Sequence, residues 1–203
     1  INTLKGEHSD VTLAFSPDGQ QFASSGFGGR IKLWDVKTYQ CLQQLEGHTN
    51  SVWQVVFSSD GKQLASASYD QTVRLWDLAS GECLRIFEGH TAAVLSVVFS
   101  YDNRLISGGF DQTVRVWDSQ TGQCIQVMQG HTSHIPTLTG SGDVNTVFSG
   151  SFDETIKLWN IDTGNCLEAF RAPRPYEKMN ITGIIGLTEA EKENLKALGA
   201  IER

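Results

Sequence analysis

The sequence predicts an all-β fold of four repeats, each a four-stranded antiparallel sheet, followed by a C-terminal tail with one short helix. Four tryptophans recur at intervals of 41 or 42 residues, at Trp34, Trp76, Trp117 and Trp159. Each one closes a short β-prone run and is followed by Asp or Asn. A fixed period near forty residues is typical of arrays in which each unit packs on its neighbours.

The second repeat shows the strand pattern most clearly. Turn signals stand at Asp60-Gly61 and Tyr69-Asp70-Gln71, with short β-prone runs on either side. A fourth strand follows the tryptophan after a further turn and ends near Phe87. The predicted repeats cover residues 6–45, 46–87, 88–128 and 129–170. Residues 1–5 look like the end of a fourth strand, so we expect them to be a leftover outer strand.

The first and fourth repeats depart from this pattern. Gly28 stands where the other repeats have an aspartate, as at Asp70, so the first repeat should have a weakened set of hydrogen bonds. Pro136 falls within the first strand predicted for the fourth repeat. Because proline removes a donor from a strand ladder, we expect a bend or bulge there.

The Gly-His pair that opens a repeat, the Trp-Asp pair that closes it and the period near forty together resemble the WD40 family of β-propellers. The resemblance covers about residues 1–171 and implies a propeller segment of four blades. It also implies one hydrogen-bonded set of His, Ser, Asp and Trp in each of three blades. The matching positions are His48, Ser66, Asp70 and Trp76; His90, Ser107, Asp111 and Trp117; and His131, Ser149, Asp153 and Trp159.

A serine, a histidine and an aspartate that recur together also suggest a catalytic triad. Three identical triads, each with its serine on an interior strand, make no catalytic sense. The chain is therefore predicted not to be an enzyme.

An aromatic residue precedes the turn aspartate, or its Gly28 counterpart, in every repeat. The resemblance places these turns on the upper rim of a propeller, together with positions of the first strands. Aromatic side chains gathered on one face are suited to anchor a peptide. Alternatively, duplication copied an aromatic residue that only packs against the neighbouring blade, and the sequence leaves both open. The predicted partner-binding residues are Phe27, Trp53, Tyr69, Leu95, Phe110, His134 and Phe152.

Composition narrows the classes of partner. The 203 residues carry a formal net charge of −7, whereas a nucleic-acid partner needs a basic face. No apolar run approaches the ~18 residues of a membrane span.

One cysteine recurs seven residues after each repeat tryptophan, at Cys41, Cys83, Cys124 and Cys166. We expect these thiols to be reduced and buried, which favours a cytoplasmic location.

The sequence holds no nucleotide-binding or zinc-protease motif, so we expect no cofactor. His131 and His134 form a His-x-x-His pair, but His131 is the expected blade histidine and no third metal ligand is evident. Each repeat also has a basic residue two positions before its tryptophan. We attribute it to strand alternation and pairing between blades. These residues are Lys32, Arg74, Arg115 and Lys157.

Residues 172–203 are predicted to form a linker and a short helix. Thr188 and Glu191 make a capping box and Gly199 marks a helix end, so the helix should cover Glu189–Leu198. Its apolar side is expected to pack back on the last blade. That side consists of Leu195, Leu198 and Ile201.

The tail, from Arg174-Pro-Tyr-Glu to Leu195-Lys-Ala-Leu-Gly-Ala, resembles the C-terminal end of large cyanobacterial WD40-repeat proteins. Many relatives of that kind carry an upstream signalling NTPase module. The leading prediction is a non-catalytic protein–protein interaction scaffold that binds a peptide or protein on the aromatic-rich propeller face. The alternative is the sensor or regulatory C-terminal portion of a larger cyanobacterial signalling NTPase.

Four complete units and one surplus outer strand favour the C-terminal part of a larger propeller, because rings have roughly 4 to 8 blades. Two other arrangements remain open. Four blades can close alone, or two chains can self-associate to complete the ring.

Overall fold

The computed structural model describes residues 10–141, 143–173, 177, 179–184 and 187–202. The chain divides into two compact units, Ile1–Phe170 and Arg171–Arg203. The first contains four four-stranded sheets and the second contains one helix, which confirms the predicted fold class. The predicted outer strand at residues 1–5 lies outside the described residues.

Each sheet is a meander in which consecutive strands are neighbours, and we number the sheets as blades 1 to 4. Blade 1 contains β1 (Asp10–Phe15), β2 (Gln21–Gly26), β3 (Ile31–Asp35) and β4 (Cys41–Leu45). Blade 2 contains β5 (Val52–Phe57), β6 (Gln63–Ser68), β7 (Val73–Asp77) and β8 (Cys83–Phe87). Blade 3 contains β9 (Val94–Phe99), β10 (Leu105–Gly109), β11 (Val114–Trp117) and β12 (Cys124–Met128). Blade 4 contains β13 (Thr137–Gly140), β14 (Thr146–Gly150), β15 (Thr155–Asn160) and β16 (Cys166–Arg171).

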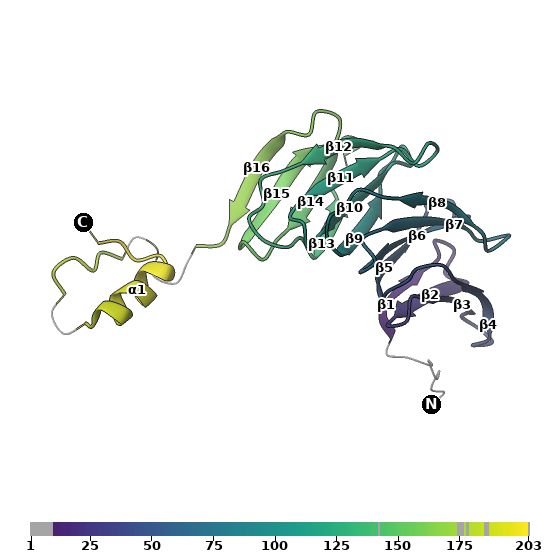
Figure 1. Ribbon diagram of the computed structural model, residues 1–203, viewed down its shortest axis with the longest axis horizontal. Coiled ribbons are helices and arrows are strands. Elements are labelled where there is room, and N and C mark those ends of the chain that lie inside the picture. Colours follow the sequence, from purple (N-terminus) through teal and green to yellow (C-terminus); the bar gives the residue numbers. More distant parts are fainter. Residues whose placement is uncertain (1–9, 142, 174–176, 178, 185–186, 203) are drawn as a thin grey trace. The chain divides into compact units, whose positions relative to one another are not determined.

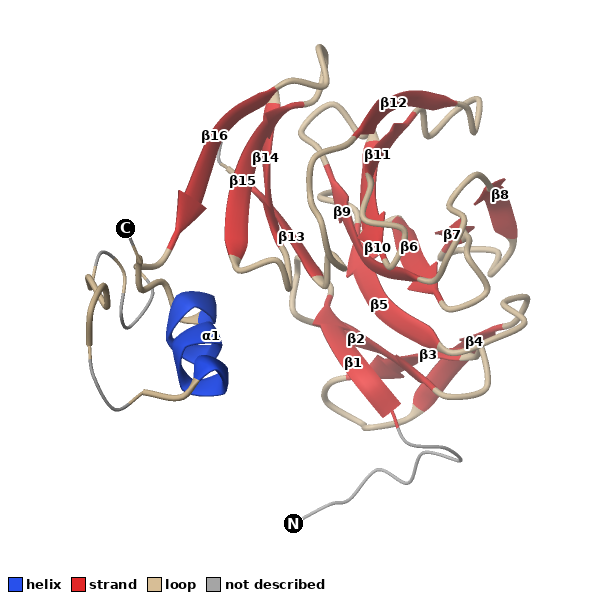
Figure 2. Ribbon diagram, turned by 60° about the vertical axis from the view of Figure 1, so that its left-hand side comes forward, coloured by secondary structure: helices blue, strands red, loops and turns tan. Residues whose placement is uncertain are grey.

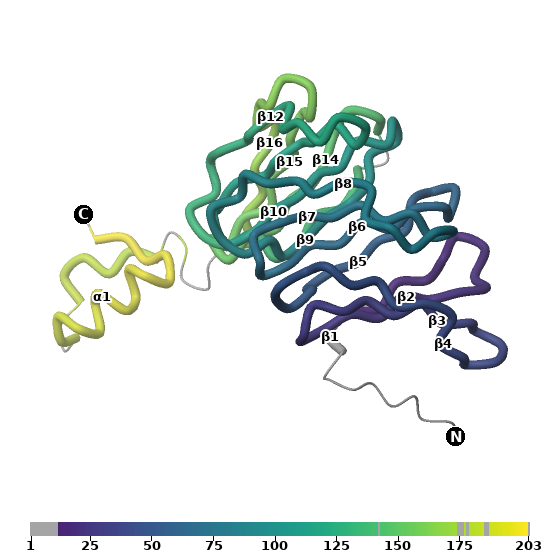
Figure 3. The backbone as a smooth tube through the Cα atoms, turned by 45° about the vertical axis from the view of Figure 1, so that its right-hand side comes forward, coloured from purple at the N-terminus to yellow at the C-terminus, as the bar shows by residue number. Residues whose placement is uncertain are grey.

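The four blades follow one another in chain order from the purple strands to the green strands of Figure 1. The first strand of each blade lies innermost and the fourth outermost, as Figure 2 shows. The inner strands contact one another in sequence, β1 with β5, β5 with β9 and β9 with β13. The tube view of Figure 3 follows the same path through the first unit.

Side-chain hydrogen bonds and left-handed residues form the turns between the strands. Between β5 and β6 the Ser58 hydroxyl donates to the Asp60 carboxylate at 2.6 Å, which in turn accepts the Lys62 N–H at 3.0 Å. Between β6 and β7 the chain reverses through Gln71, whose φ of 72° is left-handed. These bonds satisfy the backbone where the ladder stops, so the turn signals in the sequence coincide with strand ends.

A bulge opens the first strand of blades 1, 2 and 3. The register shifts by one residue between Val52 and Gln54 in blade 2 and at the equivalent places of blades 1 and 3. The extra residue is Trp53 in blade 2 and Leu95 in blade 3. A bulge re-aims the side chain of the extra residue, and this one lies beside the turn that joins the second and third strands.

The expected bend or bulge within the first strand of blade 4 is wrong. β13 begins at Thr137, directly after Pro136, and pairs with β14 in unbroken register as far as Gly140. Because proline has no N–H to donate, the ladder starts two residues later than in blades 2 and 3, and the strand has four residues instead of six.

The expectation of buried thiols is also wrong. Cys41, Cys124 and Cys166 are exposed and Cys83 is half-buried, and all four are free. Each begins the outermost strand of its blade, where no further strand covers it. Each thiol donates to the carbonyl two residues onward, as Cys83 does to Arg85 at 3.3 Å.

The basic residues before the tryptophans lie over the indole rings of their own blades. Arg74 and Arg115 lie 6.0 Å from the ring centroids of Trp76 and Trp117, and the two lysines lie 5.9 Å from theirs. Such cation–π contacts stabilise by about 0.5–1 kcal/mol at exposed sites. Their recurrence therefore has a cause inside each blade, and the predicted pairing between blades is not needed to explain it.

The second unit contains α1 (Glu189–Ala197), which ends one residue earlier than predicted. The Thr188 side chain accepts the Glu191 N–H, and Glu191 accepts the Thr188 N–H at 2.8 Å, so the predicted capping box is confirmed. Within this unit Ile181 is fully buried and its N–H donates to the Ile201 carbonyl at 2.9 Å. No helix in the described part of the chain is long and apolar enough to cross a membrane.

Candidate functional site

The turns between the second and third strands carry the predicted aromatic residues. In blades 2, 3 and 4 these are Tyr69, Phe110 and Phe152. The N–H of each donates to a carbonyl just before its blade's first strand, at 2.9 Å for Tyr69 and Phe110 and 3.0 Å for Phe152. The acceptors are Ser51, Ala93 and His134. One backbone hydrogen bond therefore sets each aromatic residue at the same end of its blade.

Five rings form a continuous series across blades 2, 3 and 4. The ring centroids are 5.4 Å apart for Trp53 and Tyr69, and 5.7 Å apart for Tyr69 and Phe110. Phe110 and His134 are 4.2 Å apart, and His134 and Phe152 are 6.2 Å apart. We call these five residues the aromatic rim. Tilted pairs at such distances stabilise by about 0.5–1.5 kcal/mol beyond the area they bury.

The rim is only partly covered by protein. Trp53, Tyr69, Phe110 and His134 are half-buried, whereas Phe152 is 69% exposed. The first four rings are therefore held in part by packing against the protein, and the last ring, Phe152, is open to solvent.

Two of the predicted partner-binding residues lie apart from the rim. Leu95 occupies the position of Trp53 in the next blade, but it is only 4% exposed and belongs to the core. Leu95 thus offers no surface to a partner. Phe27 is exposed in blade 1 and makes no ring contact within the described residues.

The rim holds one polar atom that lacks a hydrogen bond. His134 Nδ1 is buried and has no partner among the described residues. An unsatisfied buried polar atom is uncommon in a folded protein and costs about 1–3 kcal/mol.

Hydrogen-bonded sets lie next to the rim, in the same blades. In blade 2 the Trp76 indole N–H donates to Ser66 Oγ at 2.8 Å, Ser66 Oγ lies 2.7 Å from His48 Nε2, and His48 Nδ1 lies 2.7 Å from Asp70. Blades 3 and 4 repeat these distances within 0.1 Å. In blade 1 the Trp34 N–H still reaches Ser24 Oγ, at 2.9 Å. Gly28 supplies no carboxylate there.

The hydrogen-bonded set of blade 2 fits a neutral imidazole. With Nδ1–H donated to Asp70, a neutral His48 accepts the Ser66 hydroxyl proton at Nε2, while Ser66 Oγ accepts the indole N–H. Burial lowers the pKa of His48 and outweighs the raising effect of Asp70. Burial raises the pKa of Asp70, but hydrogen bonds from His48 and Thr72 outweigh it and hold that pKa well below its usual range. The same balance holds the pKa of Asp111 at about 2.

This geometry is structural in kind. Ser66, Ser107 and Ser149 are fully buried, and each hydroxyl is bonded to both its tryptophan and its histidine. A nucleophile needs an exposed oxygen next to a place for substrate, and these oxygens have neither. The described residues bring no three His, Cys, Asp or Glu side chains together in a metal-binding group. His131 lies in the set of blade 4, whereas His134 lies in the rim.

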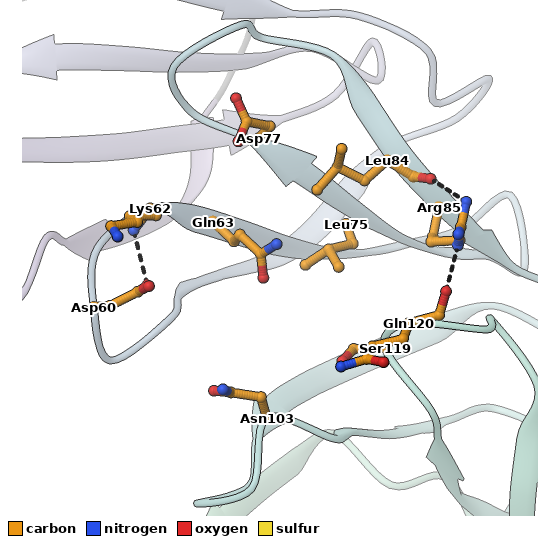
Figure 4. A pocket seen from close by; sticks show the side chains of 10 residues that line it. All are labelled: Asp60, Lys62, Gln63, Leu75, Asp77, Leu84, Arg85, Asn103, Ser119 and Gln120. Carbon is orange, nitrogen blue, oxygen red and sulfur yellow. Dashed lines mark hydrogen bonds between the residues drawn. The ribbon is translucent and has the colours of Figure 1, made fainter.

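A polar cleft of about 570 Å³ lies at the opposite end of blades 2 and 3, a feature that sequence reasoning missed. Figure 4 shows Arg85 of β8 reaching across to blade 3, where its Nε donates to the Gln120 carbonyl at 2.9 Å. Asp60, Lys62 and Asp77 also line the cleft. Glutamine occupies the position of Arg85 in blades 1 and 3. This change from glutamine to arginine is a feature of the sequence that could have pointed to the cleft. The cleft mixes both signs of charge and offers no aromatic anchor.

Comparison with known proteins agrees with this architecture. The family described as "WD domain, G-beta repeat" matches residues 1–35, 39–77, 81–118 and 122–160. The last three matches each begin near the outermost strand of one blade and run through the first three strands of the next. The sequence repeat therefore straddles two blades and ties each blade to its neighbour.

Two curated relatives share single repeats with the chain. The U3 small nucleolar RNA-associated protein 18 homolog of Arabidopsis thaliana is 48% identical over 42 residues, which are 21% of this chain and 8% of that protein. The DDB1- and CUL4-associated factor 4-like protein 2 of Homo sapiens is 40% identical over 48 residues, which are 24% of this chain and 12% of that protein. The matches thus span about a tenth of each relative's length. WD40 repeats generally serve as non-catalytic scaffolds for protein interaction, and with four repeats matched over most of its length, this chain belongs to the WD40 family.

Proposed function

We propose that the chain is a non-catalytic scaffold that binds an extended segment of a partner protein across the aromatic rim. The observation that carries the proposal is the unbroken series of ring contacts from Trp53 to Phe152. The ring of Phe152, at the end of the series, is 69% exposed and open to a partner. Aromatic anchors set in a rigid frame bind at a low cost in conformational entropy.

The chemistry of the partner follows from the rim. The half-buried ring faces accept apolar side chains. The formal net charge of −7 favours a partner segment with basic residues and disfavours a polyanion such as nucleic acid. Free thiols at the surface suit a reducing compartment, so a cytoplasmic location belongs to the proposal.

Peptides selected from a displayed library of random sequences of about 12 residues test the proposal. Wild-type protein should enrich peptides with apolar and aromatic residues. Phe152→Ala should weaken their binding by about 30-fold, the effect of losing a contact of about 2 kcal/mol. Because Phe152 is mostly exposed, the variant should keep the wild-type melting temperature.

Tyr101→Ala is the matched control. Tyr101 is also 69% exposed, but it lies between β9 and β10, at the end of blade 3 opposite the rim. Its loss should leave peptide affinity unchanged. Equal affinity of the selected peptides for Phe152→Ala and wild-type protein, or no enrichment of any peptide, would contradict the proposal.

A further inference from the structure

The three junctions between consecutive blades differ at one position, the residue two places after each repeat tryptophan. Leu78 packs against the apolar cluster between blades 1 and 2, and Ile161 belongs to the cluster between blades 3 and 4. Ser119 stands at this position in blade 3 and belongs to no apolar cluster. The junction between blades 2 and 3 therefore lacks the aliphatic side chain that the other two have, and the polar cleft of about 570 Å³ lies there.

The cleft is a property of this junction and not of an end of the array. Blades 2 and 3 each have a neighbouring blade on both sides. The residues that line the cleft all belong to these two blades. Its opening is therefore set by which side chains the two blades bring to their shared junction.

A main-chain hydrogen bond found in the other blades is missing beside the cleft. In blade 2 the Leu78 N–H donates to the Lys62 carbonyl at 3.0 Å, and blades 1 and 4 have the same bond at 2.9 Å. The equivalent groups in blade 3 are the Ser119 N–H and the Asn103 carbonyl, and neither has a partner among the described residues. The ladder between β10 and β11 also ends one residue pair earlier than the ladder between β6 and β7. Two residues that line the cleft thus present one free main-chain donor and one free acceptor.

Polar side chains without partners line much of the remaining cleft. The described residues provide no hydrogen bond to the side chains of Gln63, Asn103, Ser119 and Gln120. Amide and hydroxyl groups both donate and accept hydrogen bonds. They therefore match the alternating N–H and carbonyl groups of an extended polypeptide.

The two carboxylates that line the cleft are bound within their own turns. Asp77 accepts the N–H groups of Ala79 and Ser80 at 3.1 and 2.7 Å. Asp60 accepts two hydrogen bonds within its turn in the same way. Blade 1 has an aspartate at both equivalent positions. These carboxylates thus shape turns, and they do not distinguish this junction from the others.

Arg85 gives the cleft a positive group that is held in place but not neutralised. Its Nε donates to the Gln120 carbonyl at 2.9 Å, and its Nη1 donates to the Leu84 carbonyl at 3.1 Å. Figure 4 shows the guanidinium at one side of the cleft, with the Gln63 amide between it and Asp60. No carboxylate of the described residues pairs with Arg85, so its remaining N–H groups are available to a carboxylate of a ligand. Salt screens the negative charge of the rest of the chain beyond about 8 Å, so this nearby group decides the charge of the ligand.

We propose that the cleft binds an extended, acidic segment of a partner protein. The main chain of this segment pairs with the Ser119 N–H and the Asn103 carbonyl, and one Asp or Glu side chain pairs with Arg85. The cleft lies at the opposite end of the blades from the aromatic rim, so the two sites are separate.

Two substitutions test the site, and each installs a residue that this chain already has at an equivalent junction. Ser119→Leu fills the cleft with the side chain found at Leu78, and the added apolar burial should raise the melting temperature by about 3 °C. Arg85→Gln copies Gln43 and Gln126 and should change the melting temperature by less than about 2 °C. A lower melting temperature for Ser119→Leu would overturn the equivalence of the junctions on which the proposal rests.

Peptides from a displayed library of random sequences are selected on wild-type protein after depletion on Ser119→Leu protein. Depletion removes peptides that bind the aromatic rim, because this variant keeps the rim. The remaining peptides should be rich in Asp and Glu. They should bind Arg85→Gln about tenfold more weakly than wild-type protein, as expected for the loss of one charge-assisted contact. No enrichment after depletion, or equal affinity for Arg85→Gln and wild-type protein, would overturn the proposal.

Ala79→Leu and Phe152→Ala are the controls. Ala79 is exposed in the turn of blade 2 that corresponds to the turn of Ser119, and it does not line the cleft. Both variants should bind the depleted pool as tightly as wild-type protein. Weaker binding to Phe152→Ala would assign these peptides to the aromatic rim and overturn the proposal. Displacement of the peptides by an equimolar amount of inorganic phosphate would also overturn it, because the site would then recognise a free anion.

Discussion

At the scale of single residues, the buried serines link the sequence to the fold. Ser66 Oγ accepts the Trp76 indole N–H and is hydrogen-bonded to His48 Nε2, and so satisfies two groups from different parts of its blade. Neither group has another partner of comparable geometry among the described residues. Removing the hydroxyl leaves both unsatisfied in the core.

Ser66→Ala should therefore lower the free energy of unfolding by about 3 kcal/mol, the cost of leaving two buried polar groups without a hydrogen bond. Ser24→Ala is the matched control, because in the described part of blade 1 the Ser24 hydroxyl accepts only the Trp34 N–H. It should cost about 1 kcal/mol. Guanidinium denaturation measures both, and equal losses would show that the sets do not act as units.

Stability should also depend on pH through these sets. The pKa values of His48 and His131 are lowered in the folded protein, so the unfolded chain binds more protons below pH 6.5. The free energy of unfolding should thus fall as the pH drops through 6.5. A second fall should follow below about pH 4, because the pKa values of Asp70, Asp111 and Asp153 are also depressed by folding.

Denaturation midpoints at pH 8, 6 and 5 measure the first fall. The double variant His48→Gln, His131→Gln should be less stable at pH 8 but should lose less stability between pH 8 and 5. An unchanged pH slope in that variant would assign the dependence to other groups.

The hydrogen-bonded sets could be predicted from the sequence, because each set requires four residue types at fixed spacing in its repeat. The position of Leu95 could not. It shares its place in the repeat with Trp53, yet one side chain is buried and the other lines the rim. Repeat position fixes where the backbone lies, but it does not determine whether the side chain is buried or exposed. The prediction that the thiols are buried was wrong for a similar reason. Their regular spacing in the sequence does not show that they lie on the outermost strand of each blade, which is uncovered.

At the scale of elements, the turns between the second and third strands depend on a left-handed residue. In blade 1 this residue is Gly29, with φ of 76°, and an added Cβ would lie 2.4 Å from the His48 carbonyl oxygen. In blade 3 it is Gln112, with φ of 65°. Strand ends could be predicted from such turn residues because their chemistry is local. The start of β13 could not, since it depends on which N–H groups the ladder uses.

Exchanging residues at these two positions should have opposite effects. Gly29→Ala should destabilise the protein by more than about 2 kcal/mol, because it adds both strain and a clash with backbone. Gln112→Gly should stabilise it by about 0.5 kcal/mol, the relief of left-handed strain less the entropy that glycine loses on folding. Thermal unfolding compares the two variants with wild-type protein. A stabilising Gly29→Ala would refute this account of the turn.

At the scale of the whole molecule, the apolar clusters between blades hold the aromatic rim in register. Arg104 of blade 3 adds an ion pair to Asp162 of blade 4 at 2.8 Å. The sequence could predict four blades, because each repeat carries its own pattern. It could not show which faces are covered, since that depends on the neighbours each blade has. Regulation of a larger signalling NTPase stays a prediction from the tail alone.

The indole N–H signals of the five tryptophans, observed by NMR during titration with a selected peptide, test the rim most directly. Four of these groups are bonded to buried serines, and only the indole of Trp53 belongs to the rim. We predict that the Trp53 signal shifts with peptide concentration while the other four stay in place. A titration that moves the other four and leaves Trp53 unchanged would contradict binding at the rim.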